Sequence, residues 1–164
     1  TELKTRQTLP LPGNLGTLDS WRITQAQSQR YNRSGDSIPF GVMVRPDPAN
    51  PGCVLPLSAT GQVILGVVYR NHFRALIDSS TPGEVPDGDL IDVLARGAVI
   101  VSCEDATANI DDPVYVRHTA DGGNTLIGAV ASAAGTGLDL LPNARFVSAY
   151  YSTPGRAMIY IDLI

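Results

Sequence analysis

Apolar runs of strand length, bounded by glycine, proline or acidic residues, are the feature that most constrains this chain. The clearest example lies in the middle of the sequence, where the alternating run Leu90–Ala95 is interrupted by Arg96-Gly97 and resumes as Ala98–Val101. Asp111–Pro113 then separates these runs from Val114–Val116. β-Branched residues favour strands, whereas glycine bends a strand and proline is confined to its edges and first positions. We therefore expect a strand that bends at Arg96-Gly97, a turn and a further strand.

The same punctuation continues along the rest of the chain, which contains 16 glycines and 12 prolines. Further strands are expected at Ile38–Val44, at Cys53–Leu57 as an edge strand because of Pro56, centrally at Gln62–Tyr69, at Ala144–Tyr150 and at Arg156–Leu163. Asp121-Gly122-Gly123-Asn124 is a strong hairpin-turn signal. Because no helical pattern exceeds about ten residues, we predict an all-β fold, an antiparallel β-sandwich or barrel of short strands with an extended N-terminal arm.

The arm is predicted from residues 1–20, which have neither helical nor strand periodicity. Its prolines and glycines oppose a regular helix, yet four leucines make it unusually apolar for a free tail. An extended segment that docks on a neighbouring surface through these leucines explains both properties. The leucines are Leu9, Leu11, Leu15 and Leu18. The remainder, residues 21–164, is expected to form a single β domain.

Composition limits the classes of function that the chain can serve. A formal net charge of −4 argues against binding driven by nucleic-acid phosphates, although a local basic patch remains compatible with it. The sequence contains no apolar run of the roughly 20 residues that cross a bilayer and no secretory signal pattern, so we expect no membrane partner. Its two cysteines, Cys53 and Cys103, do not make a disulfide framework. We expect the protein to be made and used in a bacterial-type cytosol, or in a particle assembled there.

The residue types that carry chemistry are present but are not arranged in familiar patterns. The acidic group Glu104, Asp105, Asp111 and Asp112 lacks the alternating ligands and central glycine of a calcium loop, so we interpret it as solvated loop carboxylates. His72 and His118 are isolated, without a metal-ligand spacing. We therefore predict neither a metal nor a cofactor.

The sequence contains partial matches to the motifs of two classes of enzyme. Gly35-Asp36-Ser37-Ile38 is similar to the serine block of certain lipases and esterases, but no Asp-x-x-His partner follows near the end. Arg33-Ser34-Gly35 resembles the phosphate-contacting motif of trimeric dUTP-hydrolysing enzymes, but Tyr69 falls where their water-activating aspartate is required. Neither reading has a complete catalytic set, so we predict no catalytic residue and no enzyme activity.

Aromatic and arginine side chains cluster just beyond the arm. Such residues can stack single-stranded bases, but in an acidic chain they are better suited to protein contact, where tryptophan, tyrosine and arginine dominate the binding energy. The predicted contact residues are the arm leucines together with Trp21, Arg22, Arg30, Tyr31 and Arg33.

The order of several segments resembles the capsid decoration, or structural cement, proteins of tailed bacteriophages. The resemblance covers roughly residues 38–164 and is carried by Pro39–Val44, Ala59–Gly61 with Leu65–Val68, Asp92–Val101, Asp112–Arg117, Leu126–Gly128, Ala144–Phe146 and Gly155–Ile161. One departure is Asp111, where a glycine is expected, so the turn there is predicted to have a different shape.

The resemblance implies a non-enzymatic, mostly β protein of the virion, commonly a homotrimer, bound to the outside of the capsid where capsomers of the major capsid protein meet. On this reading the C-terminal strand could complete a trimer interface through Met158, Tyr160 and Leu163, although a plain core strand fits it equally. A glycan- or receptor-binding β module of a phage particle and the dUTP-hydrolysing enzyme stay open as alternatives.

Overall fold

A computed structural model of the chain describes residues 26–70, 83–149 and 155–164. These residues form eleven β-strands and no helix, and hence no helix that could cross a membrane. The all-β prediction is therefore confirmed. The strands are β1 (Ala26–Asn32), β2 (Ile38–Pro39), β3 (Met43–Pro46), β4 (Cys53–Pro56), β5 (Gly66–Val68), β6 (Glu84–Val85), β7 (Leu90–Ser102), β8 (Pro113–Arg117), β9 (Val130–Ala131), β10 (Leu138–Phe146) and β11 (Arg156–Asp162).

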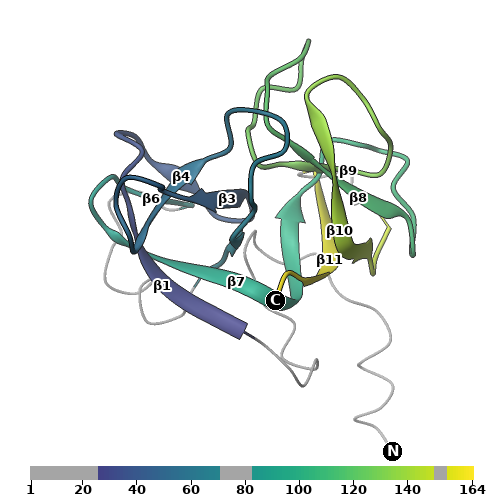
Figure 1. The fold of residues 1–164 in the computed structure, drawn as a ribbon. Helices are drawn as coiled ribbons and strands as arrows, with labels where there is room; N and C mark the ends of the chain where they lie inside the picture. Colours follow the sequence, from purple (N-terminus) through teal and green to yellow (C-terminus); the bar gives the residue numbers. More distant parts are fainter. Residues whose placement is uncertain (1–25, 71–82, 150–154) are drawn as a thin grey trace, which may run out of the picture.

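Strand β7 connects the two halves of the molecule. It is 13 residues long, and Gly97 bends it with a φ of 137°. The segment before the bend pairs with β1 and β5, and the segment after it pairs with β11. Figure 1 shows β7 passing along the base of one half before turning into the other. The bend predicted at Arg96-Gly97 is present, and backbone pairing with β11 continues through Gly97.

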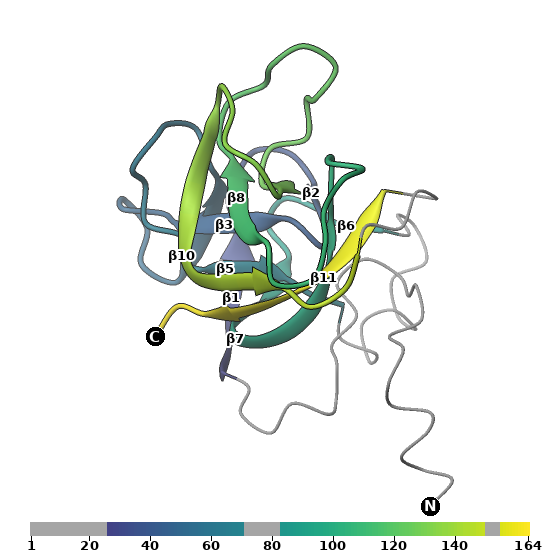
Figure 2. The same ribbon diagram turned by 90° about the vertical axis from the view of Figure 1, so that its right-hand side faces the viewer.

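Each half is a barrel-like ring of strands that includes part of β7. The first ring runs β7–β1–β4–β3–β5 and returns to β7, so that it closes. The second runs β7–β11–β10–β8–β9, and a bridge between Val130 and Cys103 links β9 to the residue that follows β7. All of these pairs are antiparallel except β1–β4 and the Cys103–Val130 bridge. Figure 2 shows the molecule turned by 90°, with β7 curving along the lower side next to β11.

Two apolar cores fill these rings. The first ring encloses mainly valine and isoleucine, and the short β2–β6 pair contributes Ile38 and Val85 to the same cluster. The second ring holds the larger core, which includes Phe146, Leu141 and Ile159 and extends to Met43 and Val67 of the first ring. Buried β-branched residues suit short strands because they pack well on a pleated surface. The two rings are therefore joined by packing as well as by β7.

Local patterns predicted some strand boundaries incorrectly. The expected strand Ile38–Val44 is divided into β2 and β3 by a turn in which Gly41 has a φ of 80°. Of the expected strand Gln62–Tyr69, only Gly66–Val68 is paired. Cys53–Pro56 was expected at an edge but lies between β1 and β3. Its proline is accommodated because pairing with β1 involves only Cys53 and Val54.

Other local predictions agree with the structure. Strand β11 falls within the expected Arg156–Leu163, and Asp121 and Asn124 exchange two backbone hydrogen bonds of 3.0 Å across their turn. Asp111 adopts a φ of 70°, the left-handed conformation that glycine takes most easily. The prediction of a differently shaped turn is therefore wrong, because the aspartate takes the backbone conformation for which a glycine was expected.

Candidate interaction surfaces

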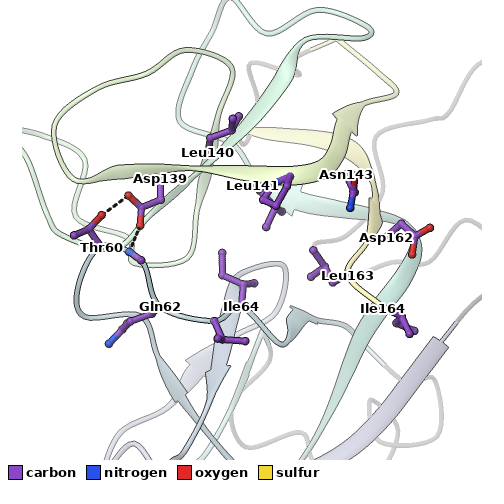
Figure 3. Close-up of a pocket in the computed structure, with 13 residues that line it drawn as sticks. Thr60, Gln62, Ile64, Asp139, Leu140, Leu141, Asn143, Asp162, Leu163 and Ile164 are labelled. Carbon is purple, nitrogen blue, oxygen red and sulfur yellow. Dashed lines mark hydrogen bonds between the residues drawn. The ribbon is translucent and has the colours of Figure 1, made fainter.

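A groove opens on the surface where the two rings meet. Its volume is about 550 Å³, and it lies between the loop Thr60–Ile64, the β10 segment Asp139–Asn143 and the chain end Asp162–Ile164. Figure 3 shows these three segments facing one another across the groove. Sequence analysis did not find it, because its walls come from segments about 80 and 20 residues apart along the chain.

The groove lies beside an interruption in the pairing of β10. Residues Leu138–Leu140 pair with β8, and pairing with β8 resumes at Arg145 after a register shift, where Ala144–Phe146 also pair with β11. Between them, Leu141–Asn143 have no strand partner in the described part of the chain, and Asn143 has a φ of 57°. Pro142 has no N–H to donate to a neighbouring strand. The strand therefore bends away and leaves a gap.

Exposed apolar side chains line this gap. Val63, Leu140 and Ile164 are 73%, 57% and 72% exposed, whereas the adjacent Ile64, Leu141 and Leu163 pack against the main core. The alternation follows from extended backbone, in which successive side chains point to opposite faces. In each wall of the groove, one apolar side chain is thus exposed. The adjacent residue packs against the core and holds the backbone of that wall in place.

Asp139 holds the rim of the groove in place. Its carboxylate accepts hydrogen bonds of 2.7 Å from the Thr60 hydroxyl and from the Gly61 N–H, and His118 Nε2 lies 3.6 Å away. The Thr60 and Gly61 hydrogen bonds, with His118 nearby, keep the pKa of Asp139 below its ordinary value. At the other end, Asp162 pairs with Arg96 at 2.7 Å. Two carboxylates therefore border an apolar groove.

A second surface contains the predicted contact residues that the structure describes. Tyr31 is 50% exposed and Arg33 is exposed at the end of β1, on one face, while the half-buried Arg30 projects from the other. The Arg30 Nε atom is buried without a hydrogen-bond partner in the described chain. The other predicted contacts, Leu9, Leu11, Leu15, Leu18, Trp21 and Arg22, lie outside the described residues.

The buried Asn32 shapes the turn beside these side chains. Its amide group donates to the backbone oxygens of Asp36 and Val85, and its oxygen accepts from the N–H and hydroxyl of Ser34. The Gly35 N–H donates to Asp87 at 2.9 Å. These bonds tie the segment after β1 to the loop before β7, so Arg33 projects from a fixed turn.

The three residues predicted for a trimer interface occupy two places. Met158 and Tyr160 share the outer face of β11, where Met158 is 7% exposed in a small cluster with Ala98 and Ile100. The Arg145 guanidinium lies 6.0 Å from the centre of the Tyr160 ring. Leu163 instead lines the groove and packs on the main core.

Three of the four acidic residues make structural contacts, which corrects the interpretation that all of them are solvated loop carboxylates, whereas Asp111 is exposed. Glu104 forms a bidentate ion pair with the buried Arg117, whose guanidinium also donates to the backbone oxygens of Thr119 and Thr136. Its hydrogen bonds to Glu104 raise the pKa of Arg117. Asp105 accepts hydrogen bonds from Ser132 and Thr107, and Asp112 accepts one from the Asn109 N–H. Among the described residues, no group of three His, Cys, Asp or Glu side chains could hold a metal ion.

The two histidines and Tyr69 complete the inventory of candidate reactive groups. His72 lies outside the described residues, and His118 lies next to Asp139 at the rim of the groove. Tyr69 is buried, and its hydroxyl donates to the side-chain oxygen of Gln27 at 2.7 Å. Burial, together with the nearby Asp92, raises the pKa of Tyr69 to about 12. At neutral pH this phenol is therefore protonated.

The described residues form an all-β fold with a groove between its two rings, and both apolar and polar side chains line this groove. A family model described as "Structural cement protein (E217 gp24/Pam3 gp6)" matches residues 4–163. Because the match spans nearly the whole chain, the protein belongs to this family, and it is a capsid-stabilising phage cement protein.

The fold is also similar to that of a solved structure. A chain in "The capsid of Myoviridae Phage XM1" aligns with a TM-score of 0.69 and 18% identity, over 94% of this chain and 91% of that chain. At this identity the likeness establishes the shared fold. No curated protein matches the sequence.

Proposed function

We propose that this cement protein binds the outer surface of a phage head, where capsomers of the major capsid protein meet, and stabilises the expanded shell. The observation that carries the proposal is the family match over residues 4–163. The protein acts by binding, without catalysis, cofactor, nucleic acid or membrane. It is made in the bacterial host cytoplasm and functions in the virion.

Homotrimer formation follows from the requirements of this role. A trimer placed where capsomers meet contacts several capsid subunits at once, so that individually weak contacts gain from a high effective concentration. Met158, Tyr160 and Leu163 are proposed to contribute to the association of subunits, with Leu163 doing so from the groove.

Capsid contact is proposed for the surface at the end of β1. Tyr31 and Arg33 are exposed on a turn that Asn32 fixes, and Arg30 retains an unused donor beneath them. Tyrosine provides a large contact area and has few rotatable bonds that binding must order. Arginine provides several hydrogen-bond donors, and both residues suit the centre of an interface. Trp21 and Arg22 extend this surface along the sequence, and the arm leucines dock on a neighbouring subunit.

Co-sedimentation with undecorated, expanded phage heads tests the proposal. We expect saturable binding at a whole number of subunits per site where capsomers meet, and higher resistance of the heads to heat. Replacing Tyr31 and Arg33 together by alanine should weaken binding by about tenfold or more with unchanged thermal unfolding. Replacement of Gln29 by alanine, also exposed on β1, is the matched control. Absence of saturable binding by the unmodified protein would refute the proposed role.

A further inference from the structure

The groove between the rings carries an inference about how copies of this protein join. Val63, Leu140 and Ile164 are all more than half exposed within a single chain. Clustered exposed apolar side chains with a polar rim mark an interaction site. Because one chain leaves these side chains open to solvent, their cover is expected from a second molecule.

Strand β1, which follows the predicted arm in the sequence, begins near the end of this groove. Ala26, the first residue of β1, pairs with Arg96, and Arg96 forms the ion pair with Asp162 at the groove's end. The neighbouring Ala95 oxygen accepts a hydrogen bond from the Leu163 N–H at 3.0 Å. In Figure 1 the start of β1 and the C-terminus accordingly lie near one another. The predicted arm thus begins close to the surface in which an identical arm could bind.

The arm sequence is complementary to the groove. Leu9 and Leu11 are separated by Pro10 and followed by Pro12, a pattern that favours extended backbone and places both leucines on the same face. Lys4 and Arg6 are the only charged residues within positions 3–12. The groove offers an apolar floor for the leucines and two carboxylates, Asp139 and Asp162, at its rim. Opposite charges at the rim would favour this register over others.

We propose that Leu9 and Leu11 of one copy dock in the groove formed by Val63, Leu140 and Ile164 of a second copy. The 15 residues from Leu11 to Ala26 can span about 50 Å when extended, enough to reach a neighbouring subunit. The arm is a strap between copies of this protein, and the groove is its receptor. This inference rests on the proposed docking of the arm, and it does not depend on attachment to the head.

Site-directed cross-linking tests the strap directly in the full-length chain. The half-buried Cys53 is first replaced by serine, while the buried Cys103 is kept. Two variants, Leu11→Cys and Val63→Cys, are then mixed and oxidised gently, both in solution and after addition to heads. We expect a disulfide-linked pair that contains one chain of each kind. Ile110→Cys, which replaces an apolar residue of similar exposure outside the groove, is the matched control and should cross-link at least tenfold less.

Loss-of-contact variants provide an independent measurement. Leu140→Asp should weaken self-association by about tenfold or more, because a charge replaces an apolar contact. Leu9→Asp combined with Leu11→Asp should do the same. A mixture of the two variants retains one intact arm and one intact groove and should recover mixed pairs. Ile110→Asp should leave association unchanged.

Three results would overturn the inference. The first concerns a chain that carries both Leu11→Cys and Val63→Cys. If its disulfide forms only within that chain and none forms between chains, the arm binds in its own groove. Cross-linking of Val63→Cys to the major capsid protein would make the capsid the occupant. Equal cross-linking with Ile110→Cys, or none in either setting, would show that the arm does not enter the groove. A protein that binds heads but fails here remains a cement protein, so the two proposals fail separately.

Discussion

The two rings share one strand but solve the problem of closure differently. In the first ring, each strand pairs with the next, and both end strands, β1 and β5, pair with β7, so that the ring closes. Its core consists mainly of valine and isoleucine. The second contains Phe146 and most of the large core, yet β10 lacks strand pairing at Leu141–Asn143 among the described residues. The groove with its exposed apolar side chains lies at this gap. Complete pairing thus closes the first ring, whereas interrupted pairing in the second accompanies a groove with exposed apolar side chains.

The largest expected effect tests where the core energy lies. Phe146→Ala removes a fully buried ring from the second core and should cost about 3–5 kcal/mol of unfolding free energy. Val54→Ala removes a smaller, equally buried side chain from the first ring and should cost about 2 kcal/mol. Because β7 belongs to both rings, each variant should shift one common transition in chemical denaturation. Separate transitions for the two rings would contradict this shared framework.

The next effect tests the contact between the rings. Gly128 has a φ of 85°, and a Cβ there would lie 2.5 Å from the Met43 backbone oxygen. The Met43 N–H also donates to Gly128 at 2.9 Å. In Gly128→Ala, either β3 or the backbone at residue 128 must therefore move. The substitution should lower the free energy of unfolding by about 3 kcal/mol or more.

Gly122→Ala is the matched control for this position. Gly122 also has a positive φ, 57°, but a Cβ there meets nothing within 4 Å. Backbone conformation alone should then cost about 1 kcal/mol. Similar melting temperatures for the two variants would mean that the rings tolerate separation at Gly128.

A smaller effect concerns acid stability within the second ring. Burial alone would raise the pKa of Asp105, but hydrogen bonds from Ser132 and Thr107 lower it from 3.8 to about 2. Since folding lowers this pKa, the stabilisation is complete above the unfolded value and disappears as pH falls through the folded value. Asp105→Asn should remove about 1 kcal/mol of pH-dependent stability between about pH 4 and 2, allowing for solvent screening. Parallel pH profiles for the two proteins would contradict this.

How far the sequence predicts the fold can be judged from particular elements. Strand β11 and the turn at Asp121–Asn124 were predictable because local alternation and turn chemistry determine them. The bend of β7 at Gly97 was also predictable, but the glycine does not specify which strands pair before and after it. Gln62–Ile64 look like part of a strand but have no strand partner in the described chain. Pairing partners distant in the sequence settled these cases.

The candidate site was harder to predict than the fold. Leu163 was predicted as an interface residue and lines the groove, but nothing local marks Val63 or Leu140 as its neighbours. A retrospective signal exists at Pro142-Asn143, where a proline and a residue with a φ of 57° interrupt an otherwise apolar strand. The sequence can therefore suggest where pairing fails. It does not show which segment faces the gap.

The smallest expected effect compares two adjacent leucines of β10. Leu141 is 3% exposed in the main core, whereas Leu140 is 57% exposed in the groove. Leu141→Ala should cost about 2–3 kcal/mol because it leaves a cavity. Leu140→Ala should change unfolding of the dilute, unassociated protein by no more than about 0.5 kcal/mol. Chemical denaturation at low protein concentration measures both.

The effects of Leu140→Ala and Leu141→Ala should depend differently on protein concentration. If Leu140 is held for a second copy, the Leu140→Ala effect should grow as protein concentration rises, because the unmodified chain gains stability from association. The Leu141→Ala effect should stay constant, since its contacts are internal. A large, concentration-independent loss at Leu140 would instead make it a core residue, and the groove would lose its main apolar contact for a partner.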